Sequence, residues 1–140
     1  MAHRLIRLAV VAVVGLAATA LGGCGFDQDF CGDYDNLTAA GESYVGGATD
    51  GRFTAADGSV DWQAMADGVA PVVEALERLK DDQLGGDDGA AVATMLQAYS
   101  QMRQSFADQD SAVLEQMSQF EGAVEAGQRL AQLYAERCQS

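Results

Sequence analysis

Apolar side chains recur at steps of three and four residues along most of this chain, and this spacing constrains the fold more than any other feature. It places the apolar side chains on one face of an α-helix. The longest run contains Val113, Met117, Phe120, Val124, Gly127, Ala131, Tyr134 and Cys138. On its polar side, Glu125 and Arg129 are four residues apart and are expected to form an ion pair. No full strand length of apolar–polar alternation occurs, so the sequence predicts an all-α domain.

Four runs of this kind predict four helices, at about residues 31–45, 62–79, 92–106 and 111–138. The first helix should end at Gly46 and Gly47, because glycine is frequent just after the last turn of a helix. Pro71 lies inside the second run, where its missing N–H should bend or split the helix near Gly68. We find no internal repeat that would suggest a different architecture.

The first 24 residues carry the pattern of an export signal. Arg4 and Arg7 precede an apolar run over residues 8–21, which is shorter than the roughly 20 residues that a transmembrane helix needs. The small residues at 18–20 would allow ordinary cleavage after Ala20. The sequence Leu21-Gly22-Gly23-Cys24 instead resembles the lipobox of bacterial lipoproteins. That resemblance implies that the cysteine thiol carries lipid and that the mature chain begins at this residue.

The resemblance divides the chain into a lipoprotein signal peptide (1–23), a short acidic tether (24–30) and a helical bundle domain (31–140). The lipid chains would anchor the protein to the cell membrane on its extracytoplasmic face. The remainder is similar in composition to small helical lipoproteins of unknown function from high-GC Gram-positive bacteria. It is rich in Ala, Gly and Asp, and the whole chain has seven Arg against one Lys. This second similarity implies no activity.

Cysteine pairing follows from the lipobox. With Cys24 lipidated, Cys31 and Cys138 remain to form one pair. The last two apolar runs are joined by a segment without Gly or Pro, so residues 88–138 could form one helix or two. Both chain ends lie at the same end of an up-down bundle of four helices, so a bond between these cysteines favours two helices and a tight turn near Gln109. We therefore predict an up-down four-helix bundle closed by a Cys31–Cys138 disulfide.

The composition of the predicted mature chain argues against several functions. Loss of Arg4 and Arg7 leaves six of the eight Lys and Arg residues against 21 Asp and Glu, a net charge of −15 that disfavours binding to nucleic acid. His3 is the single histidine and leaves with the signal peptide, which removes the commonest general base. With the cysteines lipidated or paired, no thiolate nucleophile or metal ligand remains. The sequence therefore predicts a non-enzymatic protein without a metal or cofactor.

Two groups of residues suggest ligands but fit them poorly. The segment 27–38 is rich in aspartate, yet Cys31 and Thr38 stand at the fifth and twelfth positions of a calcium loop, where oxygen ligands are needed. We interpret this segment as an acidic, solvated one. Thioethers that could bind Cu(I) come from Met65, Met95, Met102 and Met117. All four lie on apolar runs, so we expect them to fill the core.

The short tether would turn the disulfide end of the bundle toward the membrane and leave residues 47–58 and 107–110 facing outward. Arg52 and Phe53 in the first of these segments are candidate partner-facing residues, because an exposed aromatic beside a charge is a common interface anchor. The alternative is a Phe53 ring packed against the bundle. We expect a membrane-anchored interaction module of the cell envelope with an envelope protein as its partner. The alternative function is a carrier of a small apolar ligand in the bundle core.

Overall fold

The computed structural model describes residues 28–114 and 120–139. The predicted signal peptide, the Cys24 lipidation site, the first part of the tether and Met117 lie outside the described residues. The described chain forms α2 (Gln28–Thr49), α3 (Trp62–Asp81), α4 (Gly86–Ala107), the 3₁₀ helix η2 (Ser111–Leu114) and α5 (Glu121–Cys138). The predicted all-α class is confirmed.

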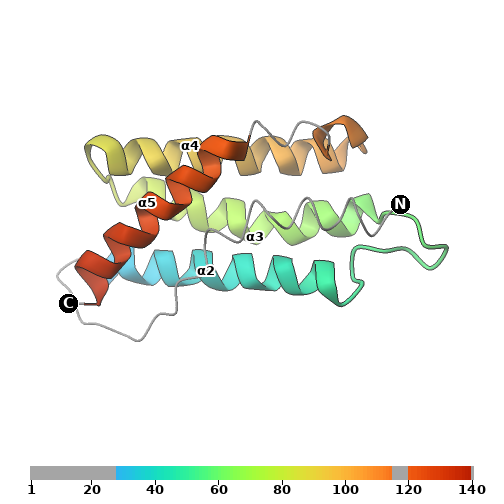
Figure 1. Cartoon of the computed structure of the whole chain (residues 1–140), viewed down its shortest axis with the longest axis horizontal. Helices are drawn as coiled ribbons and strands as arrows, with labels where there is room; N and C mark the ends of the chain where they lie inside the picture. Colours follow the sequence, from blue (N-terminus) through green and yellow to red (C-terminus); the bar gives the residue numbers. More distant parts are fainter. Residues whose placement is uncertain (1–27, 115–119, 140) are drawn as a thin grey trace.

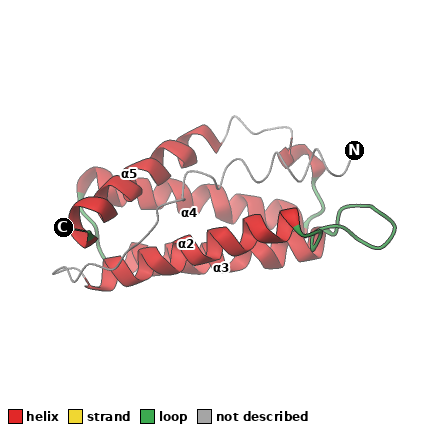
Figure 2. Ribbon diagram, turned by 60° about the horizontal axis from the view of Figure 1, so that its bottom comes forward, coloured by secondary structure: helices red, strands yellow, loops and turns green. Residues whose placement is uncertain are grey.

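The four α-helices alternate in direction and form a bundle (Figure 1). α3 lies between α2 and α4 and packs against both. α5 crosses this layer obliquely and packs chiefly on α4, with fewer contacts to α2 (Figure 2). It covers the half of the bundle in which α2 and α4 begin. The predicted up-down four-helix bundle is therefore confirmed.

The two ends of the bundle domain are joined as predicted. A disulfide links Cys31 in the first turn of α2 to Cys138 at the last residue of α5, with 5.9 Å between the two Cα atoms. The two cysteines are 107 residues apart in the sequence. The bond therefore closes almost the whole domain into one loop.

The first helix is longer at both ends than predicted. α2 begins at Gln28, three residues before Cys31, and continues through Gly46 and Gly47 to Thr49. Gly47 does not end the helix but lies inside it. A Cβ at this position would lie 2.8 Å from Cζ of Phe53, so only glycine leaves space for the ring. Side-chain-free helix surface at this point makes room for the ring.

Pro71 does not split the second helix. α3 runs as one helix from Trp62 to Asp81, and Pro71 lies on its exposed face. The flanking valines Val69 and Val72 are fully buried. Burial of this apolar face holds the helix together across the one hydrogen bond that proline removes.

The last two apolar runs form two helices, so residues 88–138 are not one continuous helix. α4 ends at Ala107, and Gln109 takes a left-handed conformation with φ of 56° that stops the helix. Residues 111–114 form η2, and Asp110 accepts a hydrogen bond from the backbone N–H of Ala112 at 3.0 Å. The predicted start of the last helix at residue 111 is wrong, because α5 begins at Glu121.

The core contains most of the described side chains on the predicted apolar runs, although Val124 is only partly buried. All four tyrosines are buried, as are the methionines on the described parts of the runs. The buried methionines are Met65, Met95 and Met102, which confirms their expected role in filling the core. Trp62 is partly buried beside Phe106, with 6.1 Å between ring centroids.

Candidate functional site

Phe53, one of the two predicted partner-facing residues, is buried. Its side chain is 4% exposed, and its ring centroid lies 5.2 Å from that of Tyr44. The ring covers Gly47 of α2 and Gly68 of α3. Packing an aromatic ring on two surfaces without side chains removes much apolar area from water. The interpretation of Phe53 as an exposed anchor is therefore wrong, and the alternative of a ring packed against the bundle is confirmed.

Arg52, the other predicted partner-facing residue, keeps an exposed side chain. Its Nε donates hydrogen bonds to both carboxylate oxygens of Asp50 at 3.2 and 2.9 Å, and Nη2 donates to the Ser43 carbonyl at 3.0 Å. The same loop contains an isolated β-bridge between Thr54 and Val60. These bonds order the loop between α2 and α3, and contact with a partner through Arg52 stays a prediction.

The aspartate-rich segment lies mostly in α2, which contains residues 28–38 of it. A calcium loop wraps successive ligands around one ion, whereas neighbouring positions of a helix point to different sides. The segment therefore lacks the loop conformation that the calcium interpretation requires.

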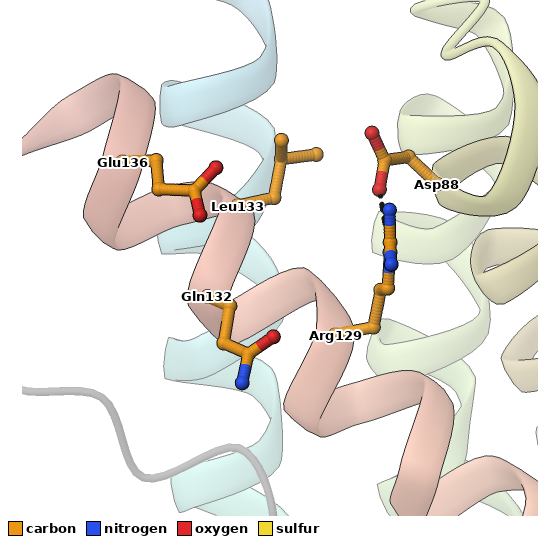
Figure 3. A pocket seen from close by; sticks show the side chains of 5 residues that line it. All are labelled: Asp88, Arg129, Gln132, Leu133 and Glu136. Atoms are coloured by element: carbon orange, nitrogen blue, oxygen red, sulfur yellow. Dashed lines mark hydrogen bonds and ion pairs between the residues drawn. The ribbon is translucent and has the colours of Figure 1, made fainter.

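A polar hollow lies between the beginning of α4 and the carboxyl-terminal half of α5. It has a volume of about 110 Å³, opens to solvent, and is lined by Asp88, Arg129, Gln132, Leu133 and Glu136 (Figure 3). The last four residues share one face of α5, because they follow helical spacing. Asp88 stands in the first turn of α4, where a carboxylate interacts favourably with the helix dipole.

One wall of the hollow is an ion pair. Nε of Arg129 donates to Oδ1 of Asp88 at 2.8 Å, although the two residues are 41 apart in the sequence. This hydrogen bond, together with the charge of Asp88, raises the pKa of the Arg129 guanidinium above its ordinary value. The expected pairing of Arg129 with Glu125 is wrong, because Arg129 extends across to α4 and bonds there.

The charges of the hollow do not cancel. Arg129 and Asp88 neutralise each other, while Glu136 adds a further carboxylate whose side chain points toward Leu133 (Figure 3). The Asp88 oxygen that does not bond Arg129 is directed away from the guanidinium. Leu133 is 7% exposed and supplies an apolar patch in the lining. The hollow therefore offers a negative charge beside a small apolar surface.

This hollow was not predicted from the sequence. The helical spacing of Arg129, Gln132 and Glu136 was a signal that these side chains share a face. Nothing local to α5 indicates that Asp88 lies opposite, because that proximity depends on how α5 crosses α4.

Two stacked tyrosines join α2 to α5 near the disulfide. The rings of Tyr34 and Tyr134 have centroids 4.6 Å apart, and the Tyr134 hydroxyl donates to Oδ1 of Asp35 at 2.7 Å. Burial and the hydrogen bond to the Asp35 carboxylate raise the pKa of Tyr134 to about 12. The hydroxyl therefore stays protonated at neutral pH and remains a donor.

A group of carboxylates surrounds Asp82 just after the end of α3. Burial raises the pKa of Asp82 to about 6, and the charge of Asp33, a hydrogen bond with Asp33 and the charges of Asp29 and Asp81 add to the rise. Nε of Arg78 lies 3.7 Å from Oδ1 of Asp33 and offsets part of this repulsion. Oδ2 of Asp82 is buried without a hydrogen-bond partner, which adds to the cost of the charged form.

Replacing Asp82 with asparagine should weaken the pH dependence of stability. The folded state holds the Asp82 proton more tightly than the unfolded chain, so this group stabilises the fold most below pH 4 and loses that contribution as the pH rises toward 6 and above. Allowing for the partial exposure of Asp82, we expect Asp82→Asn to raise the free energy of unfolding at pH 7 by about 1–2 kcal/mol relative to wild type. Urea unfolding from pH 4 to pH 7 measures this difference.

Glu77→Gln is the matched control, because it removes one exposed carboxylate from α3, the helix that ends just before Asp82. Its unfolding free energy should follow wild type across the pH range to within about 0.5 kcal/mol. If the unfolding free energies of both variants changed equally with pH, the effect would come from net charge alone and the assignment to Asp82 would be wrong.

Within residues 28–114 and 120–139, no helix has both the length and the hydropathy that a membrane crossing demands. The part of the chain that the structure describes also contains no group of three or more His, Cys, Asp or Glu side chains arranged to hold a metal ion.

Comparison of the chain with known protein families, with curated proteins and with solved structures found no match.

Proposed function

We propose that the mature protein begins at a lipidated Cys24 and is an interaction module held on the extracytoplasmic face of the cell membrane. The observation that carries this proposal is the sequence Leu21-Gly22-Gly23-Cys24, which resembles a lipobox and is followed, only four residue steps after its cysteine, by the first residue of α2. Four steps span at most about 14 Å. The lipid chains would therefore hold the helical bundle directly above the headgroups, with no long linker.

The geometry of the bundle supports one orientation. The beginning of α2, the turn between α3 and α4 and the end of α5 lie at one end (Figure 1). That end contains Asp29, Asp33, Asp81 and Asp82. Anionic headgroups repel such an end, so the lipid chains, rather than the protein surface, would supply the membrane affinity.

The proposed role is binding, not catalysis. A bundle cross-linked by a disulfide is a rigid support for partner contacts, and preformed surfaces lose little conformational entropy on binding. The partner would be another protein of the cell envelope.

Lipidation is tested by the mass of the mature protein. Purified from membranes, the wild-type chain should begin at Cys24 and carry at least a diacylglycerol, whereas Cys24→Ala should carry no lipid and incorporate no fatty-acid label. A chain that begins at Leu21 with an unmodified Cys24 thiol would instead indicate ordinary cleavage after Ala20 and contradict the proposal. Cys31 and Cys138 serve as internal controls, since both should remain in the disulfide in either case.

A further inference from the structure

We propose that the hollow between α4 and α5 binds the cationic side chain of a lysine or arginine on the protein partner. This inference rests on the proposed function and names the chemistry of the contact. The hollow is lined by Asp88, Arg129, Gln132, Leu133 and Glu136. All five residues stand on helices, which hold their side chains more rigidly than a loop would.

The charge of the hollow selects a cation. Arg129 is already paired with Asp88 at 2.8 Å, so an incoming anion would have to compete with that carboxylate. The charges of Glu136 and Asp87 also act on Arg129, so three carboxylates, Asp88 included, share one guanidinium. A ligand that brings one positive charge would balance this excess, and the strongly acidic mature chain would attract it from a distance.

The size and lining select a side-chain end rather than a free ion or a cofactor. A cavity of about 150 Å³ accepts a benzene molecule, so the 110 Å³ hollow suits a smaller group. Lysine and arginine carry the charge at the end of a long stem, so the charged end can enter the hollow and meet Glu136 while the stem lies at its rim. Gln132 offers an amide oxygen that can accept a further hydrogen bond from an ammonium or guanidinium group.

The position of the hollow adds a constraint on the partner. Glu136 is two residues before Cys138, and Asp88 lies in the first turn of α4, so the hollow belongs to the end of the bundle that the lipid would hold near the membrane. The basic residue would therefore belong to a segment of the partner close to the membrane surface.

The test is a titration of the full lipidated protein in nonionic maltoside micelles with the peptide acetyl-Gly-Lys-Gly-amide, followed by amide NMR shifts. We expect shifts confined to Asp88, Gln132, Leu133, Glu136 and their neighbours. The same peptide with an acetylated lysine should cause no such shifts. Glu136→Gln should weaken the apparent affinity at least fivefold, while Glu74→Gln, the same change at an exposed position of α3, should alter it less than twofold.

The proposal would be overturned if Glu136→Gln and Glu74→Gln weakened the apparent affinity equally, or if the amide NMR shifts were spread over the acidic surface. Either result would leave only general charge attraction. The titration does not depend on a cellular partner. If it fails while a partner is crosslinked in cells at residues 47–58, this inference is wrong and the proposed function survives. If Cys24 carries no lipid while the titration succeeds, the proposed function fails and the binding chemistry of the hollow stands.

Discussion

Removing the disulfide with the double change Cys31→Ala and Cys138→Ala should lower the free energy of unfolding by about 2–5 kcal/mol. The bond closes a loop of 107 residues, and a long loop restricts the unfolded chain most. For a domain of this size, the midpoint of thermal unfolding should fall by about 10–20 °C. Chemical denaturation monitored by circular dichroism measures the change.

The loss of stability should be concentrated in α5. This helix packs chiefly on α4 and meets α2 at fewer positions, so the disulfide and the hydrogen bond from Tyr134 to Asp35 hold its end to α2. Amide hydrogen exchange should therefore show a larger loss of protection in α5 than in the central α3. Wild type treated with a reductant is the control and should match the double variant. Equal unfolding midpoints with and without reductant would contradict the prediction.

Gly68→Ala should destabilise the protein, although alanine ordinarily stabilises a helix interior relative to glycine. A Cβ at this position would lie 2.7 Å from Cζ of Phe53, and the ring is enclosed by Tyr44 and Gly47 and cannot move aside without leaving the core. We expect a loss of about 1–3 kcal/mol, the range for an overpacked core. Phe53→Ala should lose about 3–5 kcal/mol, because it empties a buried site.

A double-mutant cycle tests the cause. In the Phe53→Ala background the ring is absent, so Gly68→Ala should change sign and stabilise the protein by about 0.5–1 kcal/mol. Gly32→Ala is the matched control, because Gly32 lies in α2 and a Cβ added there would meet no other side chain within 4 Å. It should stabilise both backgrounds by a similar amount. A Gly68→Ala effect that is the same with and without Phe53 would contradict the steric explanation.

These two contacts close opposite ends of the bundle. Phe53 packs between α2 and α3 at the end of the bundle where their connecting loop lies, and the disulfide with the Tyr34–Tyr134 stack closes the other end. The hollow beside α5 lies near the disulfide, so its shape depends on how firmly α5 is held. We therefore expect a reductant to weaken binding of the lysine peptide as well as the fold.

The all-α fold class and the order of the helices could be predicted from the sequence, because both depend on local patterns of residues. The apolar run that contains Val69 and Val72 predicted the buried face of α3. The pairing of Cys31 with Cys138 was predicted from the expected lipidation of Cys24, and the placement of this pair near the two ends of the predicted bundle favoured the up-down order of four helices. The ends of the helices were harder to predict. Gly46 and Gly47 are typical helix terminators, yet both lie inside α2, because the space left by Gly47 is occupied by a ring from the following loop.

The sequence by itself determined that this chain buries one face of each of several helices and that it carries a strong acidic excess, with 21 Asp and Glu against eight Lys and Arg. These properties follow from residue type and spacing over a few helical turns. Only the tertiary structure decided that Phe53 is buried and that Arg129 bonds Asp88 instead of Glu125. The physical reason is the same in each case: the deciding neighbour lies on another element, and only packing brings it within contact distance.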